Sequence, residues 1–547
     1  MTNNCVVKIA RSAVFTLAAV TTLVGCDTSD SAMLAEKSLV YCAEGSPEGF
    51  NPQTVTSGTT IDIVAKQLYD RLITIESKDN SLKPSLANSW HVTDDGLMYT
   101  FYLRRDVQFH QTDYFTPTRQ LSADDVVFSF QRILNQNHPY HFVGGAQYPF
   151  FQSVNFSDIV NKIERINDYT VRFHLSKPDS AFLANLATDF AVILSKEYGE
   201  LLYKQGNTNL IDSRPIGSGP YKFKDYRSGS FVRYYAHQEY WRGSPNLQQL
   251  VIDVTPSNTS RLTKLMSSEC DVIAYPIAHE KIIENENLNL ESKTAFNVGY
   301  LGFNTQKPPF DNTLVRKAVA HAINKQAIIE TIYFNQAEMA KGILPPNSWA
   351  SSDDLKGTEY SVVKAKTYLL QAGYEQGFTM DIWAMPVQRA YNPDALTMAK
   401  LIQADLAKIN ITVNIVSYEW TTFLRRLSQG EHQSVLLGWF ADHPDPDNFF
   451  SPLLSCASAQ TGNNRTFWCN QEFDMLLERA LQTNDINQRK HYYRQAQQLL
   501  SEKLPLLPIA HSKRFQASTD QVRGDILTAI GGLDFFNARK QTTQEAE

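Results

Sequence analysis

Residue patterns that carry catalysis in hydrolases are incomplete in this chain. His279-Glu280 begins like a zinc-protease motif, but Ile283 stands where a second His is required. Ser361 and Lys364 have the S-x-x-K spacing of some acyl-transfer enzymes, which chance produces easily, and no G-x-S-x-G nucleophile elbow occurs. We therefore expect a protein that is not an enzyme, with a secreted hydrolase as a minor alternative.

Side chains that bind metals are dispersed along the sequence. Zinc sites need close ligand pairs such as C-x₂-C, and the six cysteines contain none. Among the 12 histidines, His138 and His141 are close together, but they lie in a proline-containing stretch typical of a surface loop. Asp442, Asp445 and Asp447 offer oxygen ligands for a cation, which stays an alternative, and no residue marks an axial haem ligand. We expect no cofactor and no resident metal.

The N-terminus has the layout of a signal peptide. Two basic residues precede an apolar run over about 13–25, which is too short to span a bilayer. The run ends in Leu23-Val24-Gly25-Cys26, which resembles the bacterial lipobox, and Asp27 resembles the signal that keeps enteric-type lipoproteins on the inner membrane. We expect a signal peptide over 1–25, lipidation at Cys26, a tether over 26–37, and a periplasmic protein anchored to the inner membrane of a Gram-negative bacterium.

The remaining cysteines indicate disulfides, as an exported protein would form. After the two cysteines of the N-terminal region are set aside, four are left, an even number. Cys456 and Cys469 are close enough to close one loop, and Cys42 and Cys270 would then tie the N-terminal region to the middle of the chain. Four free thiols are the alternative.

Length and composition indicate a folded protein with several domains. The chain has 547 residues, enough for about three domains, with 43% hydrophobic and 20% charged residues, which excludes disorder for most of it. Lys and Arg number 51 against 57 Asp and Glu, a formal charge of −6, whereas a nucleic-acid-binding protein should be basic. Aromatic residues, at 11%, suit a large core and pockets for organic ligands.

Hydrophobic periodicity predicts mixed strands and helices, with one strand-rich segment. We expect hairpins over 91–103 and 221–235, a helix that begins after Ser122 with Asp125 at its third position, and a helix capped by Thr59 or Thr60. No second apolar run of about 18 residues occurs, so the mature chain is expected to be soluble apart from its anchor. Further strands are expected over 39–42, 169–175, 250–254, 271–274, 297–304, 380–384, 413–416 and 435–439, helices over 259–266 and 396–409, and a pair of helices over 471–502.

Six segments spread along the chain form a recognisable set: PSLANSW (84–90), DDGLMYTF (94–101), LRRDVQFH (103–110), ADDVVFSF (123–130), GSGPY (217–221) and VRKA (315–318). Together they resemble one family, the peptide/nickel group of solute-binding proteins for ABC importers (extracellular family 5). Within this group the chain is similar to dipeptide-binding proteins in residues 42–53, 383–389 and 445–450, and Sap-type peptide-binding proteins match 303–309 and 343–350 as well or better. Both subfamilies share the cysteine pairing given above.

The resemblance implies an α/β fold of the type II periplasmic binding proteins, cluster C, with two lobes, a hinge and an inserted extra domain. The ligand would lie between lobes that close about a hinge near residues 296 and 512. Lobe I would comprise 38–70, 216–296 and 513–541, the inserted domain II 71–215, and lobe II (domain III) 297–512.

By similarity to dipeptide-binding proteins, Asp442 would bind a peptide's ammonium group and Arg389 its carboxylate. Each charge needs an opposite partner in a dry cleft, and a guanidinium can bind a carboxylate bidentately. Because a dipeptide spans about 7 Å, fixing both ends selects peptide length and tolerates many side chains. Ser57-Gly58-Thr59 is expected to face the ligand, or else to cap a helix. Tyr391, Trp383, Trp420 and Trp439 would wall the pocket or pack in the core, and Asp445, Asp447 and Asn448 would brace the loop.

The function implied is the capture of di- and tripeptides in the periplasm and their delivery to an inner-membrane permease, whose partner ATPases supply the energy. We expect a monomer that binds no nucleic acid and touches the membrane only through its lipid anchor. His443-Pro444 departs from the small, flexible residues expected after Asp442, and Pro fixes φ and removes a donor. The alternative within the family is a Sap-type binder of cationic antimicrobial peptides, polyamine or haem.

Overall fold

The computed structural model describes residues 37–541, except residues 56, 77, 146 and 462, as a mixed α/β structure. The predicted signal peptide and Cys26 lie outside the described residues, as does the predicted tether apart from Lys37. In the described part of the chain, no helix combines the length and the apolar character needed to cross a bilayer.

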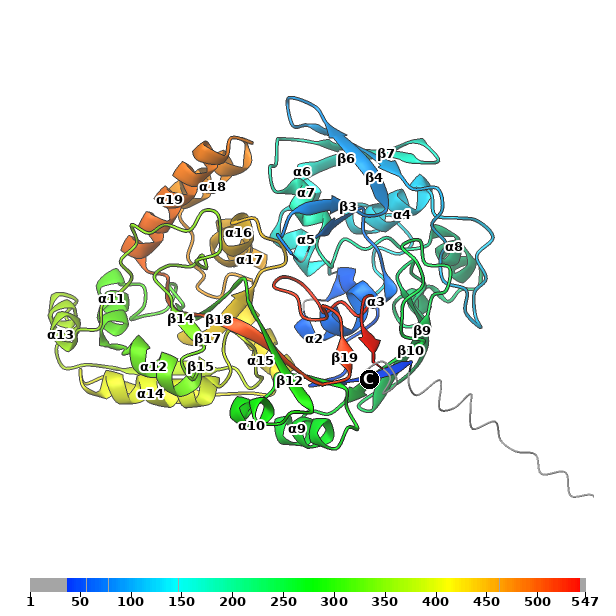
Figure 1. Cartoon of the computed structure of the whole chain (residues 1–547). Helices are drawn as coiled ribbons and strands as arrows, with labels where there is room; N and C mark the ends of the chain where they lie inside the picture. Colours follow the sequence, from blue (N-terminus) through cyan, green and yellow to red (C-terminus); the bar gives the residue numbers. More distant parts are fainter. Residues whose placement is uncertain (1–36, 56, 77, 146, 462, 542–547) are drawn as a thin grey trace, which may run out of the picture.

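One sheet of twelve strands runs through the molecule, in the order β16-β15-β17-β13-β18-β11-β1-β10-β9-β8, with β12 and β14 also paired to β18. β18 (Leu506–Thr519) belongs to both halves of this sheet. Its residues 506–510 pair with β13, whereas residues 513–519 pair with β12. Figure 1 shows β18 crossing the middle of the molecule, so this strand connects the half that contains β17 to the half that contains β10.

The half that contains β1 is assembled from the beginning, the middle and the end of the chain. β1 pairs in parallel with β10 and β11, and β8, β9 and β10 are antiparallel neighbours. Cys42 in β1 is bonded to Cys270, as predicted, in a small core with Leu262 and Ile282. The elements are β1 (Ser38–Ala43), η1 (Pro52–Thr54), α2 (Gly58–Thr60), η2 (Ile61–Ala65), α3 (Lys66–Leu68), β8 (Tyr221–Arg227), β9 (Phe231–Ala236), β10 (Gln249–Val254), α9 (Asn258–Met266), β11 (Val272–Ala274), α10 (His279–Ile283), β12 (Leu288–Thr294), β19 (Val522–Arg523) and β20 (Arg539–Lys540).

The other half begins at residue 297 and has a hydrophobic core of its own. β13 is antiparallel to β17 and β18, and β15 is parallel to β16 and β17. Cys456 is bonded to Cys469, as predicted. The elements are β13 (Asn297–Phe303), α11 (Thr313–Ala322), α12 (Lys325–Ile332), β14 (Ala337–Met339), α13 (Val362–Gln371), β15 (Thr379–Ala384), α14 (Ala395–Ala407), β16 (Thr412–Val416), α15 (Trp420–Ser428), β17 (Ser434–Phe440), α16 (Asp447–Leu454), α17 (Cys456–Thr461), α18 (Gln471–Leu481) and α19 (Ile486–Lys503).

A separate antiparallel sheet has the order β4-β5-β7-β6. Its strands lie in the sequence between α3 and β8, two elements of the β1 half. The predicted hairpin over 91–103 corresponds to β4 and β5. The predicted helix begins after Ser122, whose N–H donates to the Asp125 carboxylate (2.8 Å). One hydrophobic cluster joins this sheet to the β1 half. The elements are β2 (Ile73–Ile75), β3 (Leu82–Pro84), β4 (Ala87–Val92), β5 (Met98–Leu103), α4 (Ala123–Leu134), α5 (Pro149–Ser153), α6 (Phe156–Ile159), β6 (Val160–Asn167), β7 (Thr170–Leu175), α7 (Phe182–Leu186), α8 (Lys196–Lys204) and η3 (Thr208–Asp212).

The helix cap predicted at Thr59 or Thr60 is wrong. α2 begins at Gly58, directly after Ser57, and continues into the π-helical turn η2. The Thr59 hydroxyl donates to Glu44, and the Thr60 hydroxyl accepts the Glu48 N–H (2.9 Å). Both threonines therefore hold the 44–48 loop against the helix instead of capping it.

The β13 half contacts the rest of the chain in several places. The chain passes from the β1 half to the β13 half near residue 297 and returns near residue 512; these two points are the chain crossings. There the Asn297 amide donates to the Ser512 carbonyl (3.1 Å) and accepts the Ser512 N–H (2.9 Å). The inserted sheet region reaches the same half through the Ser180 N–H, which donates to the Leu481 carbonyl (2.8 Å). The β13 half is thus bonded to both the β1 half and the inserted region.

Candidate ligand-binding site

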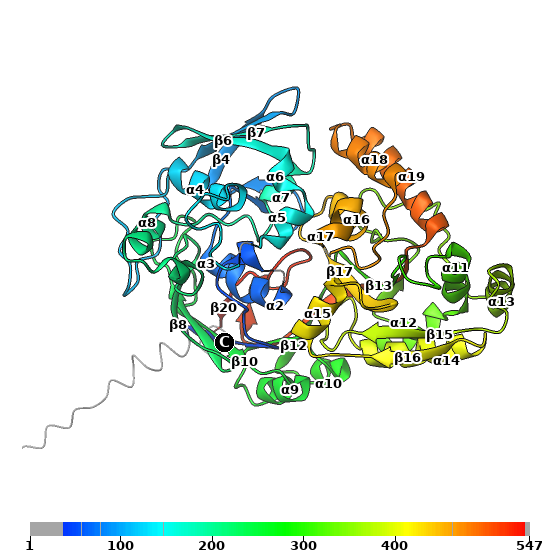
Figure 2. The same ribbon diagram turned by 180° about the vertical axis from the view of Figure 1, so that it is seen from behind.

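A cavity of about 220 Å³ lies where the two halves of the large sheet and the inserted region meet. Gly58 lines it from the β1 half, Phe150 and Phe190 from the inserted region, and Tyr300 from the β13 half. Figure 2 shows α2, α5, α15 and β17 grouped around this part of the molecule. Walls of aromatic rings with a few charged groups are typical of sites for small organic ligands.

Asp442 lines this cavity without a cationic partner in the described part of the chain. It follows β17, and its N–H donates to the Asn448 side-chain oxygen (2.9 Å), which also accepts the Trp439 indole N–H (3.1 Å). Burial raises the pKa of Asp442 to about 7, and the nearby carboxylate of Asp189 adds to the shift. A cationic group placed beside Asp442 would stabilise its ionised form.

Arg389 lies on the same cavity wall, in the connection between β15 and α14. A pair of backbone hydrogen bonds to Asn392 holds this connection in a tight turn (3.2 and 3.0 Å). The Arg389 Nη1 atom donates to the Gln388 carbonyl (2.8 Å) and lies 3.6 Å from the Glu44 carboxylate. Because a guanidinium has five donors, Arg389 can contact Glu44 and still bind a second carboxylate.

The Ser57-Gly58-Thr59 segment divides between the cavity and the protein interior. Ser57 and Gly58 line the cavity, whereas Thr59 is 5% exposed and its hydroxyl is bonded to Glu44. The expected ligand-facing position of Thr59 is therefore corrected: it lies behind the wall and positions the carboxylate that faces Arg389. Glu48 lines the cavity as well, and burial raises its pKa.

Tyr391 is placed by two glycines on adjacent strands. Gly299 in β13 is paired with Gly438 in β17, and both lie directly against Tyr391. A Cβ at Gly438 would collide with the Tyr391 ring, and a Cβ at Gly299 would collide with its carbonyl. The Tyr333 hydroxyl donates to the same carbonyl (2.7 Å). Because neither glycine has a side chain, Tyr391 can pack directly against the two strands and line the cavity.

The tryptophans of the sequence prediction have different positions. Trp420 and Trp439 line the cavity. Trp383 does not; it is 4% exposed and packs against Tyr418, Phe423 and His432 in the core of the β13 half. Core packing was the alternative for each of these rings, and it holds for Trp383.

The loop after Asp442 is braced by its own polar side chains, as predicted. Asp445 forms an ion pair with Arg489 (2.8 Å), and Asp447 accepts the Ser451 hydroxyl (2.6 Å). Within the described ranges, no group of three acidic, His or Cys residues is placed to hold a metal ion. The geometry therefore gives no support to a cation site built from Asp442, Asp445 and Asp447.

Sequence reasoning missed several residues in or next to the wall. Glu48 lines the cavity, and Glu44 lies 3.6 Å from Arg389. Both belong to the turn-rich 42–53 segment, where two acidic residues close together were an available signal. Arg465 also lines the cavity, but it lies outside the predicted strands and helices, and no sequence motif marks it. Asp62 and Arg514, which form an ion pair (2.7 Å), are distant in sequence, and only the fold joins them.

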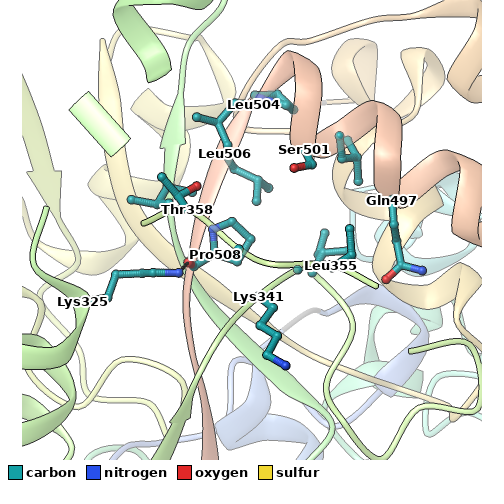
Figure 3. Close-up of a pocket in the computed structure, with 15 residues that line it drawn as sticks. Lys325, Lys341, Leu355, Thr358, Gln497, Ser501, Leu504, Leu506 and Pro508 are labelled. Atoms are coloured by element: carbon teal, nitrogen blue, oxygen red, sulfur yellow. Dashed lines mark hydrogen bonds between the residues drawn. The ribbon is translucent and has the colours of Figure 1, made fainter. Parts of the chain in front are cut away.

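A second cavity, of only about 30 Å³, lies within the β13 half between α19, β18 and the 341–358 loop (Figure 3). The Lys325 ammonium donates to the Ala340 carbonyl (2.6 Å), and burial lowers the pKa of Lys325 to about 8. A volume of this size has room for little more than a water molecule. The 30 Å³ cavity is therefore too small to be the ligand site.

Comparisons with known proteins agree with this arrangement. The family model described as bacterial extracellular solute-binding proteins, family 5 middle, matches residues 81–461. The dipeptide-binding protein of Escherichia coli K12 is 44% identical over 93% of this chain and 95% of that protein. The peptide transport periplasmic protein SapA of Salmonella typhimurium is 41% identical over 94% of each. The crystal structure of the Pseudoalteromonas sp. SM9913 dipeptide-binding protein in complex with Met-Leu superposes with a TM-score of 0.89 at 50% identity, covering 92% of this chain and all of that one. The predicted fold class is confirmed.

Proposed function

Because this chain belongs to the family 5 bacterial extracellular solute-binding proteins, we propose that it captures di- and tripeptides and delivers them to the permease of an ABC importer. The observation that carries the proposal is that Asp442 and Arg389 line one small cavity. At about 220 Å³ the cavity is smaller than the roughly 300–1,000 Å³ of sites for drug-sized ligands. A ligand with one ammonium and one carboxylate, a few ångströms apart, fits these features.

Each charged end of a short peptide has a partner in this proposal. Burial raises the pKa of the Asp442 carboxyl to about 7, and the carboxyl becomes fully ionised when it binds the ammonium. Arg389, oriented by Glu44, binds the carboxylate with its remaining donors. Ser57, Gly58, Tyr391 and Trp439 complete the wall, where apolar rings tolerate varied side chains.

The domain arrangement and the partners are part of the same proposal. Lobe I (38–70, 216–296 and 513–541), domain II (71–215) and lobe II (297–512) would move about the Asn297–Ser512 contact, which lies at both chain crossings. The protein would act as a monomer that catalyses no reaction, anchored through Cys26 to the periplasmic face of the inner membrane. Permease subunits with their ATPases would take up the peptide.

The experiment uses the chain from residue 27, which carries no lipid, and calorimetric titration with Ala-Ala, N-acetyl-Ala-Ala and Ala-Ala-amide. Blocking either end should weaken binding at least about 30-fold, because a buried charge then loses its partner. Arg389→Gln should lose the discrimination between Ala-Ala and its amide and keep that against the acetylated peptide. Arg494→Gln, at an exposed arginine, is the matched control.

Native mass spectrometry of the same protein, purified from a bacterial periplasm, provides a second readout. We expect a mixture of dipeptide masses. A protein that ignores dipeptides and takes up a cationic peptide, a polyamine or haem would refute the peptide assignment and leave the family membership intact.

A further inference from the structure

The wall of the cavity contributed by the β13 half contains a second arginine, Arg465, that sequence reasoning did not identify. Its Nη1 atom is buried and has no hydrogen-bond partner among the residues that the structure describes. Burial lowers the pKa of Arg465 to about 10, so the guanidinium is still charged at neutral pH. A buried charge without a partner is costly, and proteins keep such groups where a ligand supplies the partner.

The other two arginines of the cavity differ in this respect. Arg389 lies 3.6 Å from Glu44, and Arg514 forms an ion pair with Asp62 (2.7 Å). Over the described ranges, no Asp or Glu lies within ion-pair distance of Arg465. Of the three arginines, only Arg465 therefore has no acidic partner among the residues that the structure describes.

Arg465 is presented by a rigid loop. Its carbonyl accepts the His432 Nε2–H (2.7 Å). The neighbouring Asn464 is fully buried and donates to the carbonyls of Ser455 (3.2 Å) and Trp468 (2.8 Å). The Cys456–Cys469 disulfide closes the same loop. The backbone from which Arg465 reaches the cavity wall is thus held in place.

We propose that Arg465, with the hydroxyl of Tyr300 and the amide of Asn463, forms a second carboxylate-binding subsite of the cavity. All three residues line the cavity, and Tyr300 is close enough to Arg465 to interact with its charge. The subsite rests on the proposed peptide function and specifies its ligands: peptides with a carboxylate that Arg389 does not bind. That carboxylate is either an acidic side chain or the C-terminus of a longer peptide. A planar fork of donors suits either group.

The test measures ratios of dissociation constants by calorimetric titration of the chain from residue 27 at pH 7.5. The first pair of ligands is Ala-Glu and Ala-Gln, which differ only in the side-chain charge. The second pair is tri-alanine and its C-terminal amide. Wild type should prefer the carboxylate of at least one pair about tenfold or more. Arg465→Gln should bring that ratio close to one, Arg465→Lys should give an intermediate ratio, and the exposed-site control Arg494→Gln should leave it unchanged.

The outcomes separate this subsite from the proposed function. A loss confined to the Ala-Glu pair assigns the subsite to side chains, and a loss confined to the tri-alanine pair assigns it to the C-terminus. Wild-type binding with no carboxylate preference in either pair, or a preference that Arg465→Gln leaves intact, overturns the subsite alone. Failure of wild type to bind any of these peptides overturns both.

A second variant covers the case in which Arg465→Gln does not fold. Arg465→Met keeps the apolar stem and removes the charge. If the charge is uncompensated, the ligand-free Arg465→Met protein should melt at a higher temperature than wild type. A lower melting temperature would show that the protein itself stabilises the guanidinium, which contradicts the proposal.

Discussion

Acidification from pH 7 to pH 5 should weaken the binding of Ala-Ala through the protonation of Asp442. The pKa of this carboxyl is raised to about 7 by burial, so about half of the ligand-free molecules carry the charge at pH 7 and about one in a hundred at pH 5. The peptide ammonium, with a pKa of about 8, and the peptide carboxylate stay charged over this range. Only the ionised Asp442 attracts the ammonium, so binding must displace the proton.

The size of the effect follows from these populations. If the bound state keeps Asp442 ionised down to pH 5, the dissociation constant rises about 50-fold, or about 2.3 kcal/mol. The sign follows from proton linkage: the ligand-free site binds more protons than the occupied site, so affinity rises with pH until Asp442 is fully ionised.

The assay is a titration of intrinsic fluorescence, because Trp420 and Trp439 line the cavity. The Asp442→Asn protein provides the baseline. It retains His443, which is buried with its pKa lowered to about 4 and whose protonation in an open form would also weaken binding at low pH. For each protein, the dissociation constant at pH 5 is divided by that at pH 7. The expected 50-fold factor is this ratio for wild type divided by the same ratio for Asp442→Asn.

A matched control is Asp447→Asn. Burial also raises the pKa of Asp447 to about 7, but its side chain does not line the ligand cavity, so this variant should keep the wild-type pH dependence. Identical pH dependence in wild type and Asp442→Asn would refute the reasoning, since the ammonium would then lie elsewhere.

Two further substitutions test how the cavity is built and closed. Gly438→Ala places a Cβ against the Tyr391 ring and should cost about 1–3 kcal/mol of unfolding free energy in urea, whereas Gly58→Ala, where a Cβ meets open space, should not destabilise the fold. His443→Ala removes the hydrogen bond from Nε2 to Asn185 in the inserted region (3.1 Å), and should speed dipeptide dissociation about 2–10-fold in stopped-flow measurements. An unchanged rate would mean that this contact does not slow the release of the peptide.

The local chemistry of the fold could be predicted from the sequence. The hairpin of β4 and β5 has alternating apolar residues around a turn, and the helix after Ser122 has its acidic residue three positions later; both patterns act between near neighbours. The pairing of Cys42 with Cys270 followed once Cys456 and Cys469, which are close in sequence, were paired, because only four cysteines remained. Thr59 shows where local reasoning fails: its hydroxyl had a helix end within reach, yet it bonds Glu44 on another loop.

The state of each charged group in the cavity was decided by the tertiary structure. Asp442 and Arg389 were identified by resemblance, but the raised pKa of Asp442 and the contact of Arg389 with Glu44 depend on groups that only the fold brings near. Arg465 had no sequence signal at all, because an arginine in a loop is ordinarily solvated. The physical reason is that caps and strand alternation are interactions along the chain. Desolvation and charge pairing, in contrast, are sums over whatever surrounds a group in space, and that sum exists only in the folded molecule.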